Sequence, residues 1–353
     1  MFRSKSVVIV GAGASVEAGL PAGEGLKTAI AELLDYRFND MSGNMDSGDR
    51  SIIAAMRSAV TGQADDQHRL QRLVSSARMI RNSMPMASSI DNYIDGHNGN
   101  SDVELVGKLA IVRSILAAER VSKLYFDWRQ RGACLQHEEL KDSWYNEFMK
   151  LLTDNCRASD IAGRLANITF IVFNYDRCIE HFLYHSIQRY YGISGDEAKQ
   201  TMQNLQIFHP YGTVGSLEWS GLGNTVRYGD EVSPDKLLDL ARQIKTFTEG
   251  TDPNSSQILE IRKAISSASM VLCLGFAFHK INLELLYGER ERKDRGAGTK
   301  YFATAFGVSN SDCEVIRKEL STLAQAQSQR IALRNELTCK ELFGEYQRVL
   351  SFE

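Results

Sequence analysis

The fold is indicated by one stretch near the amino terminus, Val7-Val8-Ile9-Val10-Gly11-Ala12-Gly13-Ala14-Ser15. Four apolar residues that favour strands lead into a glycine-rich turn, and beyond Pro21 apolar residues recur at helical spacing. The pattern predicts a strand, a tight loop and a helix. Glycines in such a loop let a ligand approach the backbone, and free N–H groups at a helix start attract a pyrophosphate. An ordinary strand-to-helix connection gives the same pattern, because Val16 stands where the dinucleotide fingerprint has its third glycine.

The composition is that of a folded protein without special charge. Of 353 residues, 43% are apolar and 24% are charged. The net charge of -3 argues against a generally basic surface, so direct nucleic-acid binding is not expected. The 6 cysteines never form a C-x-x-C pair, which suits a reducing cytoplasm better than a disulfide scaffold or a zinc ribbon. No apolar run reaches membrane-spanning length, so we expect a cytoplasmic protein without a membrane segment.

The region from about residue 37 to residue 159 has mainly helical patterns. An exposed loop is expected from Phe38 to Asp49, and from Ser51 to Leu152 apolar residues recur every three or four positions. A helix is expected to start within Ser88-Ser89-Ile90-Asp91-Asn92-Tyr93, with a hydroxyl or carboxylate side chain as its cap. We therefore expect a helical insertion subdomain over 37–159, set into a domain formed by 1–36 and 160–353.

Strands and helices alternate in the second half of the chain. Strands are expected at 168–173, 205–208, 270–274 and 301–306, followed by a helix from about Asp312 and an amphipathic C-terminal segment to Leu350. This alternation predicts an α/β fold, a Rossmann-like parallel sheet flanked by helices. Ligands of such sheets bind outside the carboxyl ends of the strands. The unusual residues follow strands here: the glycine turn, Asn174 with Asp176, His209, and Gly275.

In this order, four segments resemble the sirtuin-like family, and more closely its bacterial NAD-consuming branch found in antiphage defence. The matching pieces are Gly11-Ala12-Gly13-Ala14-Ser15 with Gly19-Leu20-Pro21, Phe173-Asn174-Tyr175-Asp176, His209 with Gly212, and Leu274-Gly275-Phe276 with Asn282. The resemblance covers most of the chain from residue 7, but of the helical insertion it includes only Ser89-Ile90-Asp91.

The resemblance implies an enzyme that hydrolyses NAD to nicotinamide and ADP-ribose. Its catalytic residues would be Asn174, with its amide against the ribose or the attacking water, and His209 as general base. Asp176 would order the loop or the ribose side of the pocket. The residues expected around NAD are Gly11, Ala12, Gly13, Ala14, Ser15, Leu20, Pro21, Asp176, Gly212, Gly275, Phe276 and Asn282. Each motif also has a purely structural interpretation, since Asn-x-Asp after a strand is commonly a turn.

Departures from the family narrow the activity. Sirtuins that deacylate proteins carry a four-cysteine zinc module, whereas this chain has no paired cysteines, so NAD hydrolysis without a metal is expected instead. A dehydrogenase is disfavoured because the third fingerprint glycine and the second strand with its acidic residue are missing. Two alternatives stay open: a module that senses NAD or ADP-ribose without turnover, and a DNA-associated nuclease subunit of a defence complex.

By the same resemblance, the enzyme would be an effector that depletes cellular NAD once it is activated, as in abortive infection. The expected partners are further copies of the chain, in a homo-oligomer, and a ring-forming HerA-type DNA-translocating ATPase. The copies are expected to meet through the region from Ser51 to Leu152, for example through an apolar helix face with Leu105, Leu109, Val112 and Leu116. Packing of this face within the subunit is the alternative.

Overall fold

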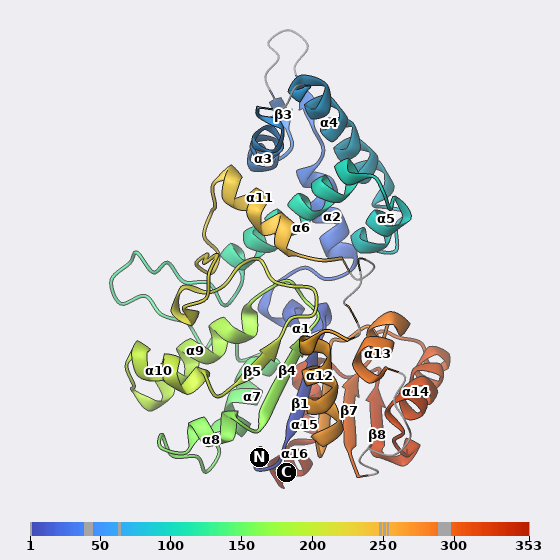
Figure 1. Ribbon diagram of the computed structural model, residues 1–353. Helices are drawn as coiled ribbons and strands as arrows, with labels where there is room; N and C mark the ends of the chain where they lie inside the picture. Colours follow the sequence, from blue (N-terminus) through green and yellow to red (C-terminus); the bar gives the residue numbers. More distant parts are fainter. Residues whose placement is uncertain are drawn as a thin grey trace.

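A computed structural model describes residues 2–38, 45–62, 65–246, 249, 252, 254–288 and 298–352. Its centre is a six-stranded sheet in which all neighbouring strands are parallel, with the order β5-β4-β1-β6-β7-β8. The strands are β1 (Ser6–Val10), β4 (Ile168–Val172), β5 (Gln206–Phe208), β6 (Met270–Leu274), β7 (Lys300–Thr304) and β8 (Ile331–Arg334). The expected α/β, Rossmann-like fold is confirmed. Figure 1 shows this sheet with helices around it, beneath a layer made mainly of helices.

The central strands are mainly apolar and buried along their whole length because both of their faces are covered. Val8 and Val10 of β1 face a core with α7 (Trp144–Thr153), α9 (Cys178–Tyr191) and α15 (Cys339–Glu345). Val7 and Ile9 face the opposite core, with α12 (Ser256–Ser267), α13 (Lys280–Tyr287) and α14 (Asn310–Ala324). Val10 is in register with Val172 and with Leu274, so these three strands end at one level.

The helical layer is built from two separate stretches of the chain, one between β1 and β4 and one between β5 and β6. It contains α2 (Glu24–Leu33), α3 (Arg50–Val60), α4 (Asp66–Ser83), α5 (Ile90–Gly96), α6 (Ser101–Val121) and α11 (Pro234–Gln243), which share one apolar core. Figure 1 shows α11 beside α3 and α6, although both of these helices end long before Pro234, where α11 begins. In contrast, α7 belongs to the expected insertion over 37–159 but packs against the sheet instead of in the helical layer. The helical layer is therefore not one continuous stretch of sequence.

Several local expectations were wrong. The glycine turn is not a loop but a single helical turn, α1 (Ala12–Ser15), followed by the 3-10 helix η1 (Val16–Ala18). In the expected loop from Phe38 to Asp49, β3 (Met45–Ser47) pairs with β2 (Arg37–Phe38), and residues 39–44 lie outside the described residues. The expected helical tail is interrupted by β8, a short strand at the sheet edge.

The expected helix start near Ser89 was correct, whereas the expected contact surface with Leu105, Leu109, Val112 and Leu116 was wrong. Ser89 caps α5, since its hydroxyl accepts a hydrogen bond from the Asn92 amide. The helix face proposed for contacts between subunits packs inside the chain: Leu109, Val112 and Leu116 are buried in the core of the helical layer. Within the described part of the chain, no helix has both the length and the apolar character needed to cross a bilayer.

Candidate functional site

The loops that follow β1 and β6 touch each other at the carboxyl edge of the sheet. The Gly11 amide donates to the Leu274 carbonyl at 2.9 Å, and the Gly13 amide donates to the Gly275 carbonyl at 3.1 Å. A Cβ atom on Gly13 would lie 2.9 Å from the Gly275 Cα, and one on Gly11 would overlap the Gly275 carbonyl. Gly275 itself has a φ of 56°. In this structure, contact between the two loops is what requires these glycines.

Some of the backbone amides after β1 that were expected to face a pyrophosphate already donate to carbonyl groups of the chain. Besides the Gly13 amide, the Ala14 amide donates to the Gly11 carbonyl at 3.0 Å. The side chain of Ser15 points to the loop after β4 instead, where it joins Asn174 and Asp176. Ala12 and Gly13 remain exposed at the surface.

Ser15, Asn174 and Asp176 form one buried hydrogen-bonded chain. The Asn174 Nδ2 donates to the Ser15 Oγ at 3.0 Å, and the Ser15 Oγ donates to the Asp176 Oδ2 at 2.8 Å. The other oxygen of Asp176 accepts from the Cys178 amide at 3.1 Å and so holds the start of α9. All three side chains come to one place because β1 and β4 are neighbours with aligned ends. The sequence prediction that these residues meet at the sheet edge agrees with the geometry.

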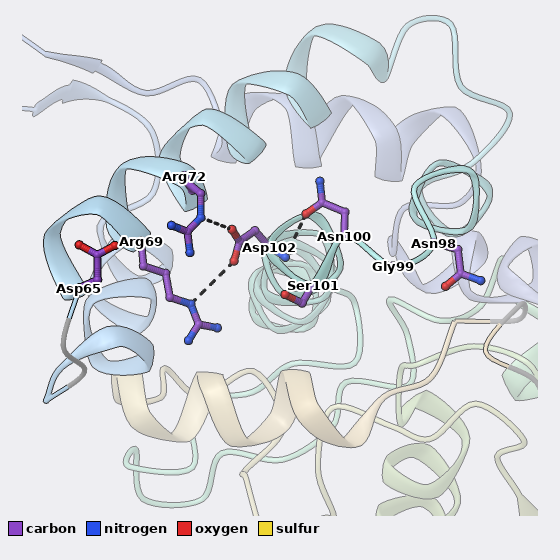
Figure 2. Close-up of a pocket in the computed structure, with 8 residues that line it drawn as sticks. All are labelled: Asp65, Arg69, Arg72, Asn98, Gly99, Asn100, Ser101 and Asp102. Carbon is purple, nitrogen blue, oxygen red and sulfur yellow. Dashed lines mark hydrogen bonds and ion pairs between the residues drawn. The ribbon is translucent and has the colours of Figure 1, made fainter.

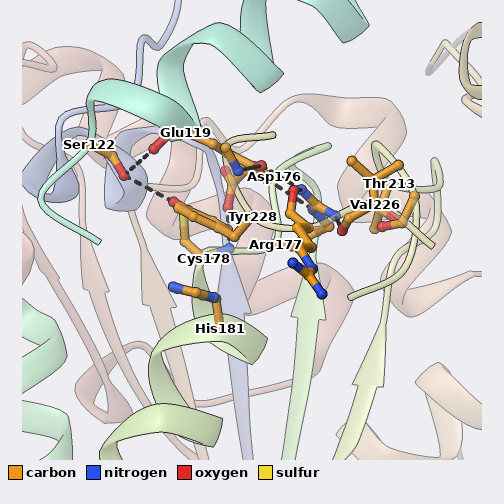
Figure 3. Close-up of polar contacts among 12 residues, drawn as sticks. Glu119, Ser122, Asp176, Arg177, Cys178, His181, Thr213, Val226 and Tyr228 are labelled. Atoms are coloured by element: carbon orange, nitrogen blue, oxygen red, sulfur yellow. Dashed lines mark hydrogen bonds and ion pairs between the residues drawn. The ribbon is translucent and has the colours of Figure 1, made fainter. Parts of the chain in front are cut away.

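In the loop after β4, Tyr175 and Arg177 alternate with Asn174 and Asp176, and these two residues contact the helical layer. Arg177 pairs with Glu119 of α6 through two bonds, from Nε to Oε1 at 3.0 Å and from Nη2 to Oε2 at 2.5 Å. The exposed fractions of these side chains are 2% for Arg177 and 0% for Glu119. Figure 3 shows this pair among Ser122, Cys178, His181 and Tyr228, at the point where α6 meets the start of α9.

Tyr175 makes the second contact with the helical layer. Its hydroxyl oxygen lies 2.8 Å from Asp91 Oδ1, near the start of α5, and 2.9 Å from the Lys245 carbonyl. A hydroxyl group donates only one hydrogen bond. The Tyr175 hydroxyl is therefore shared between these two acceptors, and burial raises the pKa of the Asp91 carboxyl.

His209 lies beside this chain, between a backbone carbonyl and a carboxylate. Its Nδ1 is 3.3 Å from the Asn174 carbonyl oxygen, and its Nε2 is 2.6 Å from Glu180 Oε1. Burial lowers the pKa of His209, but the Glu180 charge and these hydrogen bonds outweigh it, so the net pKa is raised. Both ring nitrogens face acceptors, which favours an imidazolium that donates to each. His209 is therefore one half of a His209–Glu180 pair rather than an isolated imidazole.

Glu180 and Glu119 were not found from the sequence. Glu180 lies in the first turn of α9, four residues after Asp176, and Glu119 lies in the last turn of α6. In sequence, each looks like an ordinary charged position on a helix surface. The only available signal was that Glu180 comes one helical turn after the Asn-x-Asp loop, which places it on the side of the helix that starts at the site.

The other residues predicted around NAD make contacts that do not involve the Ser15–Asn174–Asp176 chain. Asn282 accepts a hydrogen bond from the Tyr211 hydroxyl at 2.5 Å, and Phe276 packs against Phe173 with ring centroids 5.1 Å apart. Gly212 has a φ of 81° where the chain turns against Gln243. Leu20 is buried in the core and Pro21 is half-buried. None of these side chains joins the Ser15–Asn174–Asp176 chain by a bond that the structure describes.

A wide hollow in the helical layer has a different character. It measures about 960 Å3 and is lined by Asp65, Arg69, Arg72, Asn98, Gly99, Asn100, Ser101 and Asp102. Figure 2 shows both arginines of α4 directed at Asp102 of α6, whose carboxylate oxygens lie 3.8 Å from Arg69 Nε and 3.1 Å from Arg72 Nε. Asp102 thus offsets positive charge there, and we assign no site to this hollow.

The described residues contain no group of three or more histidine, cysteine, aspartate or glutamate side chains that could hold a metal ion. Comparison of the sequence with protein-family models finds no match, and comparison with curated proteins finds no significant relative.

Proposed function

We propose that this protein hydrolyses NAD to nicotinamide and ADP-ribose. The observation that carries the proposal is the juxtaposition of the Ser15–Asn174–Asp176 chain and the His209–Glu180 pair at the carboxyl edge of a Rossmann-like sheet. The family resemblance of these same residues supports it. A binding edge with an amide, a carboxylate and a histidine matches what cleavage of an N-glycosidic bond requires.

The chemistry divides between two groups. When the bond between the ribose C1′ and nicotinamide breaks, its electron pair leaves with the neutral nicotinamide and positive charge develops on the ribose. In the proposal, Asn174 orients the ribose or the incoming water, and Asp176 fixes the loop that carries Asn174. As the water oxygen bonds to C1′, the His209–Glu180 pair takes its proton. His209 must lose a proton before it accepts one, so the rate should rise with pH.

The site is nearly closed in this structure, which fits an enzyme that needs activation. Asn174 has an exposed fraction of 7% and Ser15 one of 2%. NAD would have to displace the contact between these two side chains. We propose that the protein is the effector of an antiphage system, and that the rearrangement is driven by assembly into a homo-oligomer or by a HerA-type ATPase.

The test is a direct assay of nicotinamide release from NAD, with and without candidate partners. We expect Asn174→Ala and His209→Ala each to lower turnover by about 100- to 10,000-fold. His68→Ala is the matched control, because His68 is an exposed histidine on α4. Near-normal turnover in either site variant would refute the assigned roles. Binding of NAD without nicotinamide release in any assembly would favour a sensing module instead.

The oligomer has its own test. Light scattering combined with an activity titration would show whether turnover depends on quaternary state. A strictly monomeric protein with full, concentration-independent activity would refute regulation by assembly.

A further inference from the structure

A cavity of about 300 Å3 lies beside β5, and its lining includes His209 and Glu180 but none of Ser15, Asn174 and Asp176. It is enclosed by α9, by α10 (Gly195–Met202), by β5 and by the segment around the 3-10 helix η2 (Glu218–Ser220). Figure 1 shows α9 and α10 side by side next to the β5 edge of the sheet. A volume of this size is at the lower end of the range for small-molecule sites.

The walls of this cavity are mainly apolar. Its apolar lining residues are Met202, Leu205, Ile207, Leu217, Trp219 and Leu222. Trp219 is fixed in place, since its indole stacks on Tyr184 with ring centroids 4.5 Å apart and an interplanar angle of 6°. The cavity therefore combines an apolar wall, in which Trp219 is held by stacking, with a set of polar and charged side chains.

Four charged or titratable side chains line the cavity, and three of them already form ion pairs. Arg177 is paired with Glu119, and His209 is paired with Glu180. The fourth is Lys199 of α10, which is half-buried. Its ammonium group has no hydrogen bond or ion pair with any residue that the structure describes, so it is the unmatched charge of the cavity.

Lys199 reaches across to the far wall. A Cβ atom added to Gly221, just after η2, would lie 3.2 Å from Lys199 Nζ. The ammonium therefore lies at the η2 side of the cavity. At the other end, the charges of Arg177, Glu180 and His209 are already engaged in ion pairs, so a negative head group is directed to Lys199.

We propose that this cavity binds a small organic carboxylate, with its head group on Lys199 and its apolar body between Ile207 and Leu217. A charged hydrogen bond to Lys199 supplies orientation, and the apolar walls supply most of the favourable free energy. The site goes beyond the proposed function and does not require it. If His209 and Glu180 do act on NAD, a bound carboxylate would lie against them and would alter the rate.

The experiment compares three probes with one apolar body and different heads: hexanoate, hexanol and hexylamine. Calorimetric titration of the full chain should show the tightest binding for hexanoate, then hexanol, then hexylamine. Lys199→Met should weaken hexanoate binding by about ten-fold or more, and Lys199→Arg should preserve it. Lys150→Met is the matched control, because Lys150 is an exposed lysine on α7.

A second variant, Ile207→Phe, narrows the cavity and should weaken binding of all three probes, with thermal melting used to check that it folds. The proposal is overturned if hexanol binds as tightly as hexanoate, if Lys199→Met changes nothing, or if none of the probes binds. Because the readout is binding without NAD, failure of this proposal is distinguishable from failure of the proposed NAD hydrolysis.

Discussion

The buried pair of Glu119 and Arg177 allows a prediction about how firmly the helical layer is attached to the candidate site. The Glu119 carboxylate accepts from Arg177 Nε, from Arg177 Nη2 and from the Gly229 amide at 3.0 Å. In Glu119→Ala all three bonds are lost, and a guanidinium that is almost fully buried is left without its counterion. Breaking a buried pair in this way costs about 3–5 kcal/mol of folding free energy.

Three variants measured by urea unfolding test this reasoning. Glu119→Ala should be strongly destabilised, and Glu119→Gln less so, because the amide keeps an acceptor. The double variant Glu119→Leu with Arg177→Met should recover much of the loss, since both charges are then absent. Glu147→Ala, which breaks an exposed pair with Lys150, is the control and should have little effect. A Glu119→Ala variant with less than about 1 kcal/mol of destabilisation would refute the assigned role of the pair.

Two other predictions concern the glycine contact and the histidine. Gly13→Val should lower the melting temperature because its Cβ would crowd Gly275. Gly25→Ala is the control and should not lower it, since a Cβ at Gly25 would make only an ordinary contact. Equal melting temperatures of the two variants would contradict the tight contact between Gly13 and Gly275. The raised pKa of His209 means that its charged form stabilises the fold fully at pH values below its ordinary pKa of 6.5. This stabilisation is lost as the pH rises through the raised pKa, and Glu180→Gln should remove most of the effect. An NMR titration of His209 that shows no drop in its pKa in Glu180→Gln would exclude Glu180 as the cause.

The sheet was largely predictable because burial on both faces leaves a clear pattern. β1, β4 and β6 are each buried along their whole length, and all three were expected from unbroken apolar runs. β8 was missed because it has only four residues and alternates between buried and half-buried positions at the sheet edge. Within an amphipathic tail, so short an alternation does not stand out from a helical pattern.

The candidate site was predictable only where strand ends determine it. Ser15, Asn174 and Asp176 follow strands whose ends share one register, so their proximity follows from the parallel sheet. Glu119, Asp91 and Glu180 belong to helices, and their partners are chosen by how those helices pack. A single sequence contains no periodic signal for such contacts, because a buried acidic residue on a helix has the same spacing as an exposed one.

The loop from Asn174 to Arg177 joins two layers of the molecule, and this has a thermodynamic consequence. Asn174 and Asp176 bind Ser15, whereas Tyr175 and Arg177 bind Asp91 and Glu119 of the helical layer. If separating Asn174 from Ser15 shifts the loop, the hydrogen bonds of Tyr175 with Asp91 and of Arg177 with Glu119 change as well. Consider a partner that binds α5 or α6 more tightly in the shifted arrangement. Such a partner would raise the affinity of the sheet edge for its ligand. Because linkage is reciprocal, that ligand would raise the affinity for the partner by the same factor.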